Sequence, residues 1–127
     1  MYEVGVKKEF IARHQLIGGD WGRENMPHGH HYGVEIVFVG PELDRHGYLL
    51  DIAVIERRLA EVIDRYRDQM LNELPEFRDL NPSLERFCDI FQARLMADLR
   101  LDGVERATLK LWEDASAWAS KTTVRPQ

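Results

Sequence analysis

Two segments near the N-terminus are predicted as strands, and both carry histidines. In the segment 10–16, FIARHQL, the alternation predicts a strand with Phe10, Ala12, His14 and Leu16 on one face. The segment 28–38, HGHHYGVEIVF, predicts a second strand. Its first and third histidines share a face, because residues two apart in a strand point the same way. If the two strands pair as a hairpin, the histidines of both strands face one another.

These three histidines, His14, His28 and His30, are candidate metal ligands. Three converging imidazoles without a fourth local ligand are typical of a catalytic zinc site that keeps one open position. The alternative is that the H-x-H pair consists of ordinary, partly exposed strand residues, because this spacing alone is a weak signal. The third histidine, on an otherwise apolar face, favours the metal site. His31 falls between the other two and is expected to face the opposite side.

Composition limits the classes of function. The 127 residues correspond to one domain, 1–127, that is long enough to bury a core. The net charge of −5 and the lack of a basic tract argue against nucleic-acid binding. No apolar run approaches the roughly 20 residues that span a bilayer, and the N-terminus lacks a signal-peptide core, so we expect a cytoplasmic protein without a membrane partner. The single cysteine, Cys88, excludes an internal disulfide and is expected to be buried in a helix.

Two helices are predicted in the middle of the chain. Asp51 is a suitable N-cap for a helix that reaches about Tyr66 and carries an amphipathic stripe. A loop is expected over 71–75. Asn81 as N-cap and Pro82 at the first helical position then predict a second helix that ends near Arg100.

Two further strands, over 104–112 and 115–124, complete a ββααββ order, which predicts an α+β fold with a four-stranded antiparallel sheet and two helices on one face. Such a sheet leaves two edges that invite pairing. We therefore expect a ring-shaped oligomer in which subunits close these edges. The alternative is a monomer whose edges are protected by charge.

Six segments together resemble the 6-pyruvoyltetrahydropterin synthase and 6-carboxytetrahydropterin synthase family, small enzymes of the tunnelling fold. The resemblance spans nearly the whole chain. It implies ββααββ subunits whose sheets join into a barrel, homohexamers built as a dimer of trimers, and active sites at subunit interfaces. The segments are FIARH at 10–14, HGHHY at 28–32, GYLLD at 47–51, DQMLN at 68–72, NPSLE at 81–85 and LWE at 111–113.

The resemblance also implies roles for individual residues. The family's zinc ligands fall on His14, His28 and His30. The glutamate that binds the guanidine-like edge of the pterin falls on Glu113, and a carboxylate suits that edge because it accepts two parallel N–H bonds. Ser83 stands where the family has a threonine near the pterin pocket.

Two departures from the family concern proton transfer. The synthases carry a cysteine shortly before the H-G-H motif, and here Glu24 is the best candidate for its position. A branch of the family that carries glutamate there is linked to side-chain cleavage of dihydroneopterin. Asp68 matches the family's catalytic aspartate, but Gln69 replaces the histidine that follows it. Glutamine cannot exchange a proton near neutral pH.

Three hypotheses follow. The first is a zinc-containing homologue that binds a pterin-like small molecule with altered or absent synthase chemistry. The second is an active zinc-dependent lyase on the side chain of dihydroneopterin or its triphosphate, with Glu24 in place of the cysteine. The third is a non-catalytic oligomeric protein that binds a metal or another ligand. His46 has no assigned role in any of them.

Overall fold

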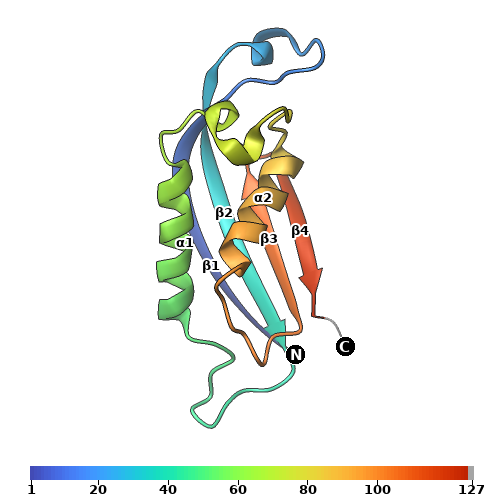
Figure 1. The fold of residues 1–127 in the computed structure, drawn as a ribbon. Helices are drawn as coiled ribbons and strands as arrows, with labels where there is room; N and C mark the ends of the chain where they lie inside the picture. The colour runs from blue at the N-terminus through green and yellow to red at the C-terminus, as the bar shows by residue number, and fades with distance from the viewer. Residues whose placement is uncertain (126–127) are drawn as a thin grey trace.

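Residues 1–125 are described by a computed structural model of the chain. Four antiparallel strands form one sheet in the order β1-β2-β3-β4, and two helices cover one of its faces (Figure 1). Three short 3-10 helices, η1 (Gly22–Asn25), η2 (Leu71–Glu73) and η3 (Pro75–Phe77), lie in the connections. The main elements are β1 (Tyr2–His14), β2 (His28–Gly40), α1 (Ile52–Tyr66), α2 (Leu84–Met96), β3 (Arg106–Trp112) and β4 (Trp118–Val124).

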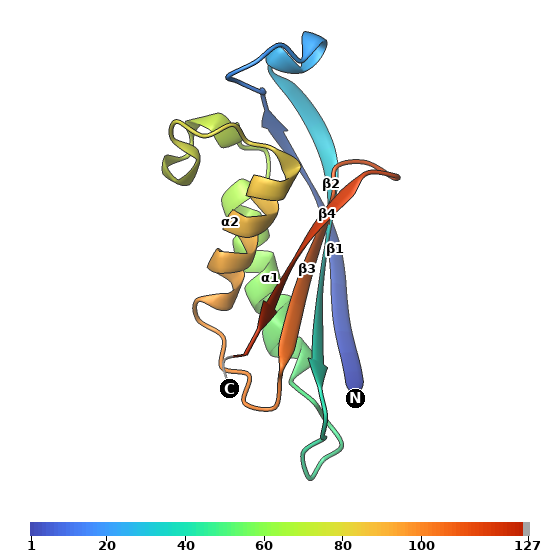
Figure 2. The same cartoon turned by 90° about the vertical axis from the view of Figure 1, so that its right-hand side faces the viewer.

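The predicted ββααββ order and the placement of both helices on one face are confirmed. Figure 2 views the sheet edge-on, with α1 and α2 on one side and the other face of the sheet open. No helix within residues 1–125 combines the length and apolar character needed to cross a membrane.

The core lies between the helices and the sheet. Alternate residues of the strands point toward the helices, and the apolar stripes of α1 and α2 meet them there. Cys88 is buried in α2 as predicted, and its thiol donates to the carbonyl of Leu109. An aromatic group forms the centre of this layer, made of Phe10, Tyr32, Tyr66, Phe77, Phe87 and Phe91.

The strand limits differ from the prediction. The strand predicted over 10–16 is in fact β1, which begins eight residues earlier and ends at His14. Its first half escaped the pattern because Lys8 interrupts the apolar side. The last strand begins at Trp118 rather than at 115, because residues 113–117 form the turn after β3, in which the amide of Glu113 donates to the carbonyl of Ala117.

The limits of the second helix also need correction. Neither Asn81 nor Pro82 begins α2: the N-cap is Ser83, whose hydroxyl accepts from the amide of Arg86. The helix ends at Met96 instead of near Arg100. Its last carbonyls are satisfied from α1, where the guanidinium of Arg58 donates to the carbonyls of residues 94 and 95. The predicted loop over 71–75 contains η2 and the start of η3.

The chain beyond His14 is held by asparagine side chains instead of a neighbouring strand. Asn72 pairs with both backbone groups of Gln15, through its carbonyl oxygen at 2.8 Å and its amide nitrogen at 2.9 Å. The side-chain oxygen of Asn81 accepts from the amide of Ile17 at 2.8 Å. Asn72, in the segment DQMLN, and Asn81 therefore fix the chain just after β1, next to the candidate ligand His14.

Both outer strands of the sheet have unpaired edges. Within residues 1–125, β1 and β4 each pair with one strand of the sheet. A single bridge between Arg13 and Met70 covers the upper end of β1. Such edges present backbone N–H and C=O groups with which another strand can pair.

Candidate functional site

Three histidine rings converge at one end of the sheet, on the face covered by the helices. The β1–β2 register places His14 opposite His28, and His30 follows two residues later on the same side. Their ring centroids lie 4.5, 4.9 and 4.8 Å apart, and one ligating nitrogen from each ring lies within 4.8 Å of the others. The convergence that the alternation predicted is therefore present in the fold.

The Nε2 atoms of these three rings are buried and have no hydrogen-bond partner. Two of the rings are oriented through the opposite nitrogen: Nδ1 of His14 donates to the carbonyl of Pro82 at 3.1 Å, and Nδ1 of His28 donates to the carbonyl of Met26 at 2.7 Å. A carbonyl can only accept, so the proton is on Nδ1 and the lone pair of the neutral ring is on Nε2. Metal-binding histidines are commonly oriented in this way.

The environment of His14 favours a neutral imidazole. His14 is 2% exposed, and burial lowers its pKa to about 4, with the neighbouring rings of His30 and His28 adding to the effect. The neutral form is the one that binds a metal ion. Three buried and unpartnered Nε2 atoms, one of them on a ring that burial keeps neutral, therefore fit a divalent transition metal.

Glu113 lies directly beside this cluster. Its Oε1 atom is 2.9 Å from Nε2 of His30 and 3.7 Å from Nε2 of His14. Burial raises the pKa of the Glu113 carboxyl; His30 opposes this rise and Glu24 adds to it. The late glutamate singled out by the resemblance thus shares the site of the three histidines.

Glu24 is brought to the same place by the connection between β1 and β2. It lies in η1, and its carboxylate, His30 and Glu113 offer ligand atoms within 4.8 Å of one another. Asn25 organises this connection, since its side chain accepts from the amide of Trp21 and donates to the carbonyls of Leu16 and Gly19. In Figure 1 this connection projects beyond the end of the sheet.

Two other candidate residues lie beside the cluster and not in it. Ser83 uses its hydroxyl to cap α2, next to the Pro82 carbonyl that orients His14. Asp68 is exposed at the outer edge of β1, where its amide donates to the carbonyl of Ile11. It has a positive φ of 59°. Within one chain, Asp68 is not part of the histidine and glutamate cluster.

The remaining polar residues of the sequence analysis lie elsewhere. Gln69 is exposed, and its backbone carbonyl accepts from the backbone amide of Arg13. His31 points to the open face, as expected, at 3.7 Å from Glu9. His46 lies in the connection between β2 and α1, at the opposite end of the sheet.

The sequence analysis did not identify the groups that orient the ligands. Nothing in the residue types marks the carbonyls of Pro82 and Met26 as acceptors. Tyr32 was also missed, although its hydroxyl lies 3.4 Å from Nδ1 of His14. Burial raises the pKa of Tyr32, as do Glu113 and Glu24, so the phenol stays protonated. Its place two residues after His30, on the same strand face, was the available signal.

A hollow of about 430 Å³ lies on the open face of the sheet, at the same end as the histidine cluster. His30 and Glu113 line it from one side, and the indole of Trp112 lies over Gly33 at its floor. The ammonium group of Lys7 is 4.2 Å from the centroid of that indole.

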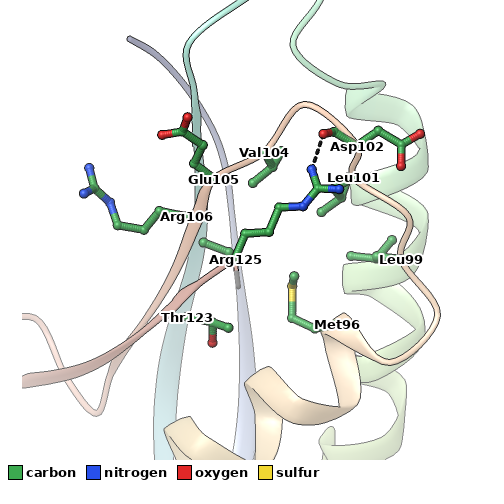
Figure 3. A pocket seen from close by; sticks show the side chains of 10 residues that line it. Met96, Leu99, Leu101, Asp102, Val104, Glu105, Arg106, Thr123 and Arg125 are labelled. Atoms are coloured by element: carbon green, nitrogen blue, oxygen red, sulfur yellow. Dashed lines mark hydrogen bonds between the residues drawn. The ribbon is translucent and has the colours of Figure 1, made fainter. Parts of the chain in front are cut away.

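A second hollow, of about 230 Å³, lies far from the histidines at the other end of the sheet (Figure 3). Met96 and Leu99 form its apolar side, and the guanidinium of Arg125 at its rim donates to the carbonyl of Asp102. No histidine or cysteine lines it.

Comparison with known proteins agrees with this fold. The family model for 6-pyruvoyl tetrahydropterin synthase matches residues 3–123. No curated protein is similar enough to this chain to count as a match.

Solved structures of 6-pyruvoyl tetrahydropterin synthases share the fold of this chain. The Caenorhabditis elegans 6-pyruvoyl tetrahydropterin synthase is 19% identical, with a TM-score of 0.81 over 98% of this chain and 96% of that chain. The Plasmodium vivax enzyme is 16% identical, with a TM-score of 0.82 over 98% of both chains. Two further Plasmodium vivax structures carry alanine or cysteine in place of a glutamate described as a catalytic residue. With the family model covering nearly its whole length, the chain belongs to the 6-pyruvoyl tetrahydropterin synthase family.

Proposed function

We propose that this protein binds a dihydropterin-like ligand at a zinc ion held by His14, His28 and His30, and that it acts on the ligand's side chain by a reaction other than the standard synthase reaction. The observation that carries the proposal is the meeting of three unpartnered Nε2 atoms with the carboxylates of Glu24 and Glu113. A pterin presents N–H donors and a hydroxylated side chain, and these features match the two kinds of group in the cluster.

The residues of the site have two proposed roles, ligand binding and proton transfer. Bound zinc would polarise the oxygens of the ligand's side chain. Glu113 accepts the N–H donors of the ring edge, and Glu24 accepts a proton from the side chain. Glu24 is exposed in the single chain and lies beside His30 and Glu113, where a carboxylate within hydrogen-bond reach of the ligand's side chain can act as a general base. The catalytic glutamate described for the Plasmodium vivax enzyme supports this role for Glu24.

A second candidate function is ligand binding without turnover. It is favoured by Gln69, which replaces a proton-transferring histidine, and by the exposure of Asp68 outside the cluster of its own chain. If Asp68 contributes to catalysis, it acts in the site of a neighbouring subunit. Ser83, beside Pro82, is proposed to line the pterin pocket from the start of α2.

Binding and turnover can be separated with a Glu24→Gln variant. We expect the zinc-loaded protein to bind both neopterin and dihydroneopterin, and to release the side chain of dihydroneopterin only when Glu24 is present. The glutamine keeps the size of the side chain but cannot accept the proton, so turnover should fall by about 100-fold or more while binding changes little. Calorimetric titration measures binding, and chromatography of the pterin product measures turnover.

Tight pterin binding with no product from either protein would favour the second candidate function. Absence of pterin binding to the zinc-loaded protein would contradict the proposal. Equal turnover by both proteins would remove Glu24 from the mechanism.

We also propose a homohexamer, arranged as a dimer of trimers, in which the free edges of β1 and β4 join the sheets of neighbouring subunits into a barrel. Exposed apolar residues on these strands, Tyr2, Trp118 and Val124, support the proposal. Light scattering during gel filtration should give a mass of about 89 kDa, six times the 14.8 kDa of the chain. A single species of about 15 kDa at micromolar concentration would contradict it.

A further inference from the structure

The carboxylate of Glu113 occupies an unusual position for a group whose proposed task is to bind a ligand in the neighbouring hollow. Its Oε1 atom lies 2.9 Å from Nε2 of His30, yet this nitrogen has no partner with hydrogen-bond geometry. The same oxygen is 3.7 Å from Nε2 of His14. Because Nδ1 of His14 donates to a carbonyl, its Nε2 atom presents a lone pair to this oxygen.

Such an arrangement of electron-rich atoms is unfavourable without a cation among them. The carboxylate oxygen and the lone pair on Nε2 of His14 repel each other, whereas a shared metal ion attracts both. Ligands bound to a tetrahedral zinc ion at about 2.0–2.1 Å lie roughly 3.3 Å from one another. The two distances from Glu113 fall on either side of this value, so its oxygen fits the ligand sphere of the same ion as the histidines.

We propose that Glu113 is the fourth ligand of the metal ion when the pocket is empty, and that a bound pterin takes this carboxylate away from the metal. The inference rests on the metal site of the proposed function. Glu113 immediately follows β3, its side chain is 23% exposed, and it lines both the histidine cluster and the hollow. Rotation of one side chain therefore exchanges its partners, and ligand recognition opens a coordination position.

Cobalt titration tests this inference without any turnover. Co²⁺ replaces zinc in nitrogen and oxygen sites, and its visible absorption bands depend on the number and type of its ligands. In Glu113→Gln, we expect Co²⁺ to bind at least about tenfold more weakly and with changed bands, because even the loss of groups outside the ligand sphere costs 10–100-fold in affinity. Asp114→Asn is the matched control, since it removes an adjacent exposed charge. Glu24→Gln removes the other carboxylate near His30.

Both control variants should keep the bands of the native protein, and addition of neopterin to the native protein should change its bands. If Glu113→Gln has the same affinity and bands as the native protein, the inference is overturned. The same holds if Glu24→Gln, rather than Glu113→Gln, changes the bands. If the bands depend on Glu113 but do not change with neopterin, Glu113 is still the fourth ligand. Its displacement by a pterin, and the proposed pterin binding, are then overturned. No Co²⁺ binding to the native protein overturns the metal site itself.

Discussion

Replacing His28 with alanine is expected to abolish stoichiometric zinc binding, and replacing His31 with alanine is expected to leave it unchanged. The first substitution removes one of three unpartnered Nε2 atoms that converge at the end of β2. The neighbouring His31 is 64% exposed on the opposite face. Since loss of an outer hydrogen-bond partner already weakens metal binding 10–100-fold, loss of a ligand should exceed about 100-fold.

Competition with a chromophoric chelator measures the affinity, and elemental analysis of the purified protein measures the zinc content. The two substituted positions are three residues apart in sequence, and both variants carry the same chemical change. A general effect of losing an imidazole would therefore appear in both. Both should retain the far-ultraviolet spectrum of the native fold, because His28 contributes to the site and not to the apolar core. Equal zinc content in His28→Ala and the native protein would contradict the three-histidine site.

Alternation was enough to identify the three histidines but not to place them against one another. Residues two apart in a strand share a face, so the grouping of His28 with His30 follows from local geometry. The position of His14 depends on the register with the next strand, and a shift of one residue would have turned it to the open face. Glu24 and Glu113 reach the cluster from turns, for which the sequence offers no period.

Helix limits were predictable where the local signals agreed with the tertiary contacts. Asp51 caps α1 as predicted, because its side chain accepts from the amide of Ala53. The Asn81-Pro82 pair predicted a helix start that the fold does not use. The asparagine side chain instead accepts from the amide of Ile17, and the carbonyl of Pro82 faces His14, so the helix begins after Ser83. A distant contact thus replaced a local one at a residue that supports the site.

The aromatic group beneath the histidines links the core to the site. Phe87 is fully buried at its centre, with five aromatic rings at centroid distances of 5.2–6.1 Å. One of these rings belongs to Tyr32, whose hydroxyl lies beside His14. The packing of α2 against the sheet therefore also supports the position of a candidate ligand.

We expect Phe87→Ala to lower the free energy of unfolding by about 3–5 kcal/mol, because it removes a large buried ring and leaves a cavity among side chains that cannot all move to fill it. This is a large part of the roughly 5–15 kcal/mol that stabilises a typical domain. Urea denaturation of the metal-free protein measures the change, at one protomer concentration for all variants, since an oligomer's stability depends on concentration. Phe87→Leu is the control: it keeps most of the apolar volume and should cost about 1–2 kcal/mol. A loss below about 1 kcal/mol for Phe87→Ala would mean that the core readily closes around the missing ring, and that Tyr32 is held by its other neighbours.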